Sequence, residues 1–139
     1  MKVIVDTSVW SLALRRRAPA HATVDELRRL ISQGRVAMLG PIRQELLSGL
    51  RDTAAFRRLR DHLRAFADEP LDHEDYERAA EHFNTCRAAG VQGSNTDFLL
   101  CAVAERRAFP LLTTDADFTR YAALLPVRLH SLEGARDQR

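Results

Sequence analysis

Short apolar segments alternate with helical segments along this chain, and this alternation constrains the fold more than any other feature. The clearest apolar segment is Val3-Ile4-Val5, which is rich in β-branched residues and ends at an acid, Asp6. Strands that alternate with helices predict a mostly parallel sheet flanked by helices, because parallel strands need a crossover connection. The sequence therefore predicts an α/β fold.

Local signals give the expected element boundaries. Thr23 and Glu26 have the spacing of a capping box, and Pro41 suits a first helical turn. Asp72 is a helix-capping residue before a long helical pattern. Strands are expected over residues 2–5, 36–39, 111–113 and 127–130, and helices over 7–14, 23–32, 41–50, 53–66, 73–90, 97–107 (capped by Asn95 or Thr96) and 115–123.

The chain of 139 residues is long enough for one domain and too short for two. We expect that domain over residues 1–133 and a frayed polar tail over 134–139. The apolar run of residues 98–104 has only seven residues, whereas a membrane span needs roughly 20. An early acid argues against a signal peptide, and two cysteines fit a reducing compartment. These features predict a cytoplasmic protein without a membrane segment.

Charge by itself does not decide the function. The formal net charge is +2, and all but one of the 21 basic residues are arginine. A GC-rich genome accounts for such a bias, although arginine also suits phosphate recognition. The clusters at Arg15-Arg16-Arg17 and over residues 51–64 fit either interpretation. The second cluster lies on an amphipathic helix, where a polar face exposed to solvent explains most of its arginines.

Four acids follow predicted strands or open helices, where ligands bind in open parallel sheets: Asp6, Glu45, Asp97 and Asp115. Carboxylates crowded into one cleft repel each other unless a cation neutralises them. A cluster of oxygen ligands without His or Cys suits Mg²⁺ or Mn²⁺ rather than zinc. Taken singly, each acid also fits a helix cap, so spacing alone is a weak signal.

The sequence around each acid is more specific. Val-Ile-Val-Asp6-Thr-Ser-Val-Trp, Pro-Ile-Arg-Gln-Glu45-Leu-Leu, Asn-Thr-Asp97-Phe-Leu-Leu and Leu-Leu-Thr-Thr-Asp115-Ala-Asp-Phe occur in this order. This arrangement resembles the PIN-domain nucleases, and among them the VapC-type toxins of bacterial toxin–antitoxin pairs. The resemblance covers roughly residues 2–130.

The resemblance implies a PIN-like three-layer α/β/α fold and a metal-dependent endoribonuclease. Asp6, Glu45, Asp97 and Asp115 match the family's catalytic and metal-binding acids, with Mg²⁺ as the implied cofactor and Mn²⁺ as the alternative. Asp117 is either a further ligand or a helix-opening residue. Thr7 and Thr113 match hydroxyl positions that orient a carboxylate or a metal-bound water, and both also fit turn or capping residues. The implied partners are RNA, a VapB-like antitoxin and a second copy of the chain in a homodimer.

Other conspicuous residues leave alternatives open. Arg43 either contacts substrate phosphate or pairs with an acid. Trp10 either packs in the core or a dimer interface or stacks on an RNA base. His82 and Cys86 form half of a zinc pattern, but the sequence offers no second pair nearby.

Competing functions of sheet-based proteins lack their motifs here. A haloacid dehalogenase-type phosphatase needs an acid at the position of Ser8, and a response-regulator receiver needs a late lysine, whereas Lys2 is the sole lysine. The sequence also lacks the glycine-rich phosphate loops and the serine hydrolase elbow. Two hypotheses remain: a metal-dependent endoribonuclease toxin, and a non-cleaving PIN-like module that binds RNA or protein.

Overall fold

A computed structural model describes residues 1–15 and 20–132. Helices and strands alternate along the chain as the sequence predicts. The strands are β1 (Val3–Val5), β2 (Val36–Ala37) and β3 (Leu111–Leu112), and the helices are α1 (Thr7–Ala13), α2 (Ala22–Ser32), α3 (Gly40–Leu47), α4 (Thr53–Leu63), α5 (His73–Ala88), α6 (Asn95–Arg107) and α7 (Asp117–Leu124).

The three strands form one parallel sheet in the order β2-β1-β3. Ile4 of the central strand aligns with Ala37 on one side and with Leu111 on the other. All three residues of β1 are fully buried. A strand that helices cover on both faces has no polar side, which is why this segment lacks the alternation of a half-exposed strand.

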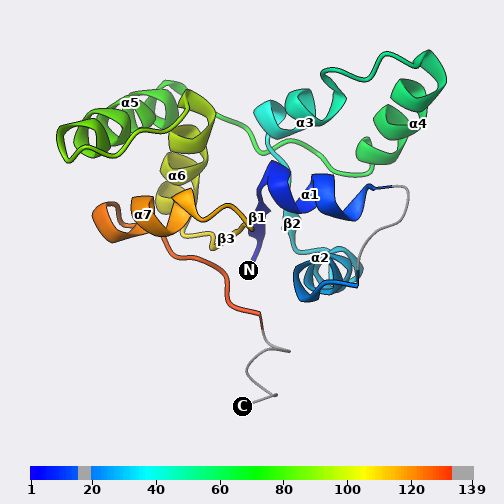
Figure 1. The fold of residues 1–139 in the computed structure, drawn as a ribbon, viewed down its shortest axis with the longest axis horizontal. Coiled ribbons are helices and arrows are strands. Elements are labelled where there is room, and N and C mark those ends of the chain that lie inside the picture. Colours follow the sequence, from blue (N-terminus) through cyan, green and yellow to red (C-terminus); the bar gives the residue numbers. More distant parts are fainter. Residues whose placement is uncertain (16–19, 133–139) are drawn as a thin grey trace.

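The helices form two groups, one on each side of the sheet (Figure 1). Helices α1 to α4 lie on the side of β2, and α5, α6 and α7 lie on the side of β3. Helix α6 is buried from Phe98 to Ala104, because it packs between the sheet and α5. The apolar run that is too short for a membrane span is thus the core of the second helical group. No helix within the described residues is long and apolar enough to cross a membrane.

The predicted strand over residues 127–130 is wrong. Leu129 makes a single parallel bridge to Leu111. Within β3, only Leu111 has its backbone N–H and C=O directed toward residues 128–130. Its N–H donates to the Arg128 carbonyl, and its carbonyl accepts from the His130 N–H. The next residue that would face that segment, Thr113, already lies in the turn after β3. Since β3 is so short, a second bridge has no place to form.

Two predicted helix starts are also wrong. His21 caps α2, with its Nδ1 accepting a hydrogen bond from the Thr23 N–H at 3.0 Å. Glu26 does not complete the predicted capping box, because its buried carboxylate binds Arg29 and His130 instead. At α6, Ser94 is the cap rather than Asn95 or Thr96. The predicted cap of α5 by Asp72 is confirmed, and its partner in the capping box is Asp75.

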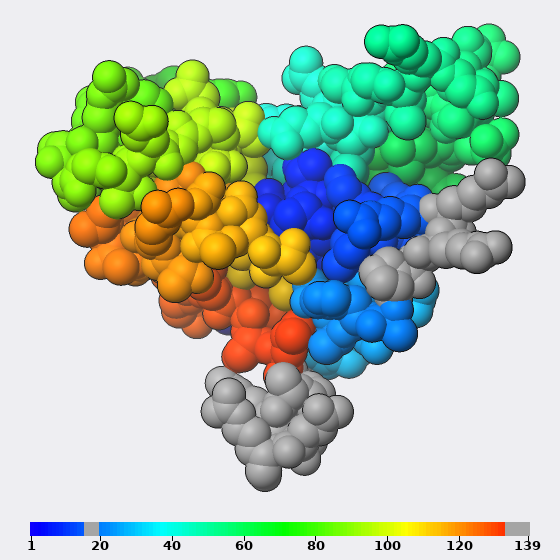
Figure 2. Space-filling model, viewed as in Figure 1, coloured from blue at the N-terminus to red at the C-terminus, as the bar shows by residue number. Residues whose placement is uncertain are grey.

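A deep notch separates the two groups of helices at one end of the molecule (Figure 2). Its walls come from α3 and α4 on one side and from α5 and α6 on the other. The carboxyl end of β1 and the start of α1 lie at its floor. Arg16 and Arg17 of the first basic cluster and the predicted tail over residues 134–139 lie outside the described residues.

Candidate active site

Asp6 lies at the carboxyl end of β1 and is only 7% exposed. Its backbone N–H donates to the carbonyl of Leu112, so pairing with β3 continues up to the acid itself. The hydroxyls of Ser8 and Thr113 both donate to its Oδ2, at 2.8 and 2.9 Å. One carboxylate oxygen is therefore fixed by two hydroxyl donors, one from the first turn of α1 and one from the end of β3.

The turn after β3 places Asp115 beside this network. The Thr113 hydroxyl, which donates to Asp6, also accepts a hydrogen bond from the backbone N–H of Asp115 at 2.9 Å. Asp115 in turn accepts at Oδ1 from the backbone N–H of Asp117, at 2.9 Å. Asp117 opens α7 and forms an ion pair with Arg120 on the surface. These contacts of Asp117 fit a helix-opening residue, which is the second of the two roles that the sequence allowed for it.

Asp97 lies in the first turn of α6, where the cap by Ser94 fixes the start of the helix. The hydroxyl of Tyr121 donates to its Oδ2 at 2.9 Å. Burial raises the pKa of Asp97, and the negative charges of Asp6 and Asp115 raise it further, against the opposing hydrogen bonds. The charges of Asp6 and Asp115 are thus close enough to act on Asp97, although the three acids come from three separate segments.

Glu45 lies on α3, on the other side of the notch. The Thr7 hydroxyl donates to its Oε2 at 3.0 Å, which ties α3 to the start of α1. Glu45, Thr7 and Thr96 line one open cavity of about 500 Å³. Two of these lining residues are neighbours of acids in the sequence, since Thr7 follows Asp6 and Thr96 precedes Asp97.

The donor set fits a hard, hydrated cation. Among residues 1–15 and 20–132, no three His, Cys, Asp or Glu side chains converge closely enough to enclose a metal ion. Mg²⁺ does not need such an enclosure, because it keeps several water molecules and takes only one or two carboxylates directly. A divalent cation would relieve the repulsion that the charges of Asp6 and Asp115 exert on the Asp97 carboxylate.

Arg43 pairs with an acid, which is the second of the two roles that the sequence allowed for it. Its guanidinium donates to Asp68 at 2.9 and 3.0 Å and to the carbonyls of Leu63 and Phe66. These contacts connect α3 to the chain after α4. Trp10 is buried in the core and packs edge-on against Phe66, with ring centroids 5.3 Å apart.

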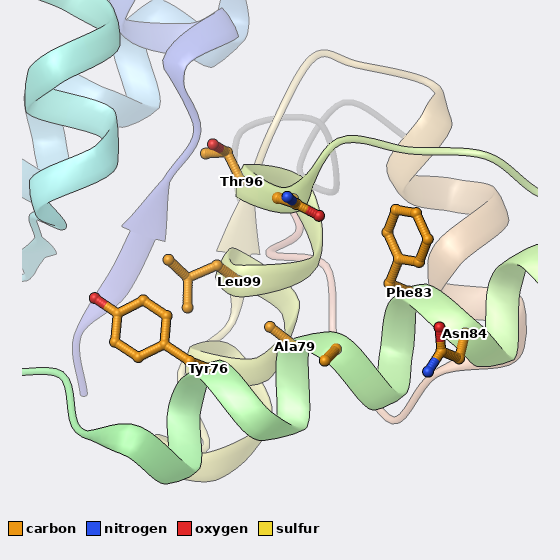
Figure 3. Close-up of a pocket in the computed structure, with 8 residues that line it drawn as sticks. Tyr76, Ala79, Phe83, Asn84, Thr96 and Leu99 are labelled. Atoms are coloured by element: carbon orange, nitrogen blue, oxygen red, sulfur yellow. The ribbon is translucent and has the colours of Figure 1, made fainter.

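A second pocket adjoins the notch, between α5 and α6 (Figure 3). It has a volume of about 390 Å³ and is lined by Tyr76, Ala79, Ala80, Phe83, Asn84, Asn95, Thr96 and Leu99. Tyr76 is 55% exposed, so its ring is available to a ligand or partner. The pocket contains none of the four acids, but its lining residue Thr96 directly precedes Asp97 on α6.

Sequence reasoning missed two residues of this site. Ser8 follows Asp6 by two positions, and its hydroxyl within the first motif was a usable signal. Tyr121 had none, because it looks like an ordinary apolar residue of an amphipathic helix. His82, half of the suggested zinc pattern, is buried beside Glu105 instead.

Comparisons with known proteins agree with this architecture. The family model for the PIN domain matches residues 3–124. The chain is 32% identical over 120 residues to VapC ribonuclease Mb1587 of Mycobacterium bovis and to ribonuclease VapC11 of Mycobacterium tuberculosis, covering 84% of this chain and 88% of each relative.

Solved structures share the fold at lower identity. The FitAcB structure from Neisseria gonorrhoeae has a TM-score of 0.74 and 22% identity, covering 93% of this chain and 96% of the other. The VapBC2 structure from Rickettsia felis, bound to a promoter DNA fragment, has a TM-score of 0.74 and 17% identity, covering 94% and 98%.

The chain belongs to the PIN-domain family. Within that family it is a homologue of the VapC ribonucleases. The predicted α/β, PIN-like fold is confirmed.

Proposed function

We propose that this chain is a divalent-cation-dependent endoribonuclease that acts in the cytoplasm as the toxin of a toxin–antitoxin pair. The observation that carries the proposal is the convergence of acids from separate segments: the Thr113 hydroxyl donates to Asp6 and accepts from the backbone N–H of Asp115, and the charges of both acids act on Asp97. Glu45 is tied to the start of α1 by the Thr7 hydroxyl. Ribonucleases of this family are typically metal-dependent. Asp6, Asp97, Asp115 and Glu45 are the residues that would hold Mg²⁺ or Mn²⁺.

A divalent cation bound there would make water a better nucleophile and stabilise the negative charge that develops on the phosphodiester. The residues of the chain provide the orientation. Ser8 and Thr113 hold the Asp6 carboxylate, and Thr7 holds Glu45 toward the cavity. In-line attack of water at phosphorus would leave 5′-phosphate and 3′-hydroxyl ends.

A non-cleaving RNA- or protein-binding module is the other function that the fold allows. The burial and repulsion at Asp97 argue against it, since a binding module gains nothing from clustered like charges. Buried carboxylates without a compensating cation cost stability. A protein that cuts RNA has a use for that arrangement.

The pocket beside the acids suggests how the substrate lies. Single-stranded RNA is recognised through unstacked bases, which stack on aromatic rings and bond to polar side chains. The exposed ring of Tyr76 and the amides of Asn84 and Asn95 offer both kinds of contact. We infer that this pocket takes a base next to the phosphodiester that is cut.

The partner that we propose is a cognate VapB-like antitoxin. Solved relatives with this fold include toxin–antitoxin complexes. An apolar groove of about 320 Å³ between α1, α2 and α4 offers a site for an antitoxin segment. Leu14 and Ile31 on its rim are 43% and 40% exposed. Replacing Ile31 with Asp should therefore weaken antitoxin binding without changing RNA cleavage.

We also propose that the chain forms a homodimer. Sedimentation at micromolar concentration tests this directly, and a monomeric mass would contradict it. The antitoxin should be removed before the measurement, because a bound partner changes the mass by itself.

The central experiment measures RNA cleavage by purified chain without antitoxin. Cleavage should require Mg²⁺ or Mn²⁺, stop with EDTA, and fall by about 10³-fold or more in Asp6→Asn and Asp97→Asn, as expected when a charge that stabilises the transition state is lost. Asp25→Asn is the matched control, because Asp25 is an exposed acid on α2. Folded wild-type chain that cuts no RNA tried would favour the binding module.

A further inference from the structure

Tyr121 reaches the acidic cluster from α7, a helix that contributes none of the four predicted acids. Its hydroxyl donates to Asp97 Oδ2 at 2.9 Å, although the residues are 24 positions apart. The tyrosine is only 1% exposed, so water does not compete for this hydroxyl. The Gln92 carbonyl oxygen lies at 3.4 Å, at the outer limit of a hydrogen bond. Asp97 is therefore the main partner of the Tyr121 hydroxyl.

Aromatic packing fixes the position of that hydroxyl. The Tyr121 ring contacts Phe98 with centroids 5.0 Å apart and Phe118 edge-on with centroids 5.1 Å apart. Phe98 follows Asp97 on α6, and Phe118 precedes Tyr121 by one turn of α7. The ring that bears the hydroxyl and the helix that bears the carboxylate are thus held by one shared cluster.

Gly93 shows that the loop before α6 is built around this tyrosine. A Cβ at position 93 would collide with the Tyr121 hydroxyl oxygen, and would lie 2.8 Å from Tyr121 Cζ and 3.0 Å from Phe98 Cε2. The positive-φ glycines of the described residues are at 34, 49 and 90, so Gly93 is not required by a left-handed backbone. The close approach of the ring is what requires glycine here.

We propose that Tyr121 is a positioning residue that holds the Asp97 carboxylate in the orientation needed to bind a divalent cation, and that Gly93 provides the space for it. This inference rests on the proposed function. The carboxylate lies among like charges that favour its turning away. A fixed donor on Oδ2 opposes that rotation, as hydrogen bonds to ligating carboxylates do in metal sites.

A purely structural role for Tyr121 makes a different prediction. A buried tyrosine needs a partner for its hydroxyl in any protein. If Asp97 only satisfies that need, removing the hydroxyl changes the free energy of unfolding and leaves cation binding as it was. A positioning role changes cation binding even where the protein stays folded.

The test is calorimetric titration of Mn²⁺ into the full chain, without RNA. Tyr121→Phe keeps the ring and removes only the donor, and we expect it to bind Mn²⁺ about 10-fold more weakly than wild type. Gly93→Ala keeps the hydroxyl but displaces the ring, so it should weaken binding in the same direction. Leu30→Ala is the control, because it removes a buried core side chain on α2, which lies in the other group of helices.

Circular dichroism and thermal unfolding establish that each variant is folded. Kinetics with RNA give a second readout: kcat should fall in Tyr121→Phe while KM for RNA stays at the wild-type value. Equal Mn²⁺ affinity in folded Tyr121→Phe and wild type overturns the inference and leaves the proposed function intact. A wild type that binds Mn²⁺ but cuts no RNA contradicts the proposed function alone. A wild type that binds no Mn²⁺ contradicts both.

Discussion

Thr113 donates a hydrogen bond to Asp6 at 2.9 Å across 107 positions of sequence. The two residues directly follow β3 and β1, which lie side by side and run parallel. Parallel strands end at the same edge of a sheet, so residues that follow them meet. The same Thr113 oxygen accepts from the N–H of Asp115, and it therefore connects two of the proposed cation-binding acids.

Removing this hydroxyl should impair both acids. We expect Thr113→Val to lower kcat for RNA cleavage by about 10-fold, because carboxylates that lose an orienting partner bind metal less well. Thr113→Ser keeps the hydroxyl and should retain most of the activity. Thr119→Val, at an exposed position on α7, is the matched control. A fully active Thr113→Val would mean that the backbone alone orients Asp6.

Glu45 can be tested separately because it lies on α3, in a cavity that none of the other three acids lines. Glu45→Gln keeps the side-chain oxygen that accepts from Thr7 and removes the negative charge. If the charge is what matters, kcat should fall by about 10²-fold or more, while the melting temperature stays near the wild-type value. An equal loss in Thr7→Val alone would instead assign the effect to the orientation of Glu45.

Asp75 should be a main determinant of stability away from the site. Its carboxylate is fully buried and accepts from Arg106 at 2.6 Å and Arg107 at 2.8 Å. Replacing Asp75 with Asn should reduce the free energy of unfolding at pH 7 by about 2–3 kcal/mol, because two arginines lose their one fully buried charged partner. Urea unfolding measures this, and Asp61→Asn on the surface of α4 is the control.

The same carboxylate should make the protein sensitive to acid. The Arg107 hydrogen bonds, against the opposing effect of burial, hold the pKa of Asp75 well below its usual range. The unfolded chain therefore binds this proton first, and stability is lost as the pH falls below the ordinary aspartate pKa of about 3.9. In Asp75→Asn, this part of the acid dependence should be absent.

His82 should give a second pH dependence, at higher pH. It is buried on α5, and burial lowers its pKa against the partly opposing charge of Glu105, which lies 3.4 Å away. The unfolded chain then takes up a proton near pH 6.5 while the folded chain does not. Stability should fall as the pH drops through 6.5, and His82→Gln should lose this slope in unfolding measured between pH 8 and 5. An unchanged slope would contradict the assignment.

Tyr76 tests the proposed base pocket. We expect Tyr76→Ala to raise KM for single-stranded RNA by about 10-fold with little change in kcat, since a stacked base contributes roughly 1–3 kcal/mol to binding. Tyr76→Phe keeps the ring and should bind RNA nearly as well. If Tyr76→Ala instead changes the oligomeric state, the exposed ring is a contact between two copies of the chain.

Much of this protein was predictable because local rules governed it. The apolar segment before Asp6 gave a buried strand, and Asp72 capped α5 as predicted. Local rules failed where distant contacts compete with them. Glu26 does not form the predicted capping box, because its carboxylate binds Arg29 and His130 in the folded protein.

The amino-acid sequence by itself determined the α/β class, the alternation of strands and helices, and where the four candidate acids fall along them. It determined these because burial patterns, caps and strand ends are properties of neighbouring residues. Only the tertiary structure decided which groups hold those acids. The Thr113 and Tyr121 hydroxyls act through direction and distance, and their partners come from elements far apart in the chain. Such directions depend on how helices and strands pack together, and no local pattern of residues encodes them.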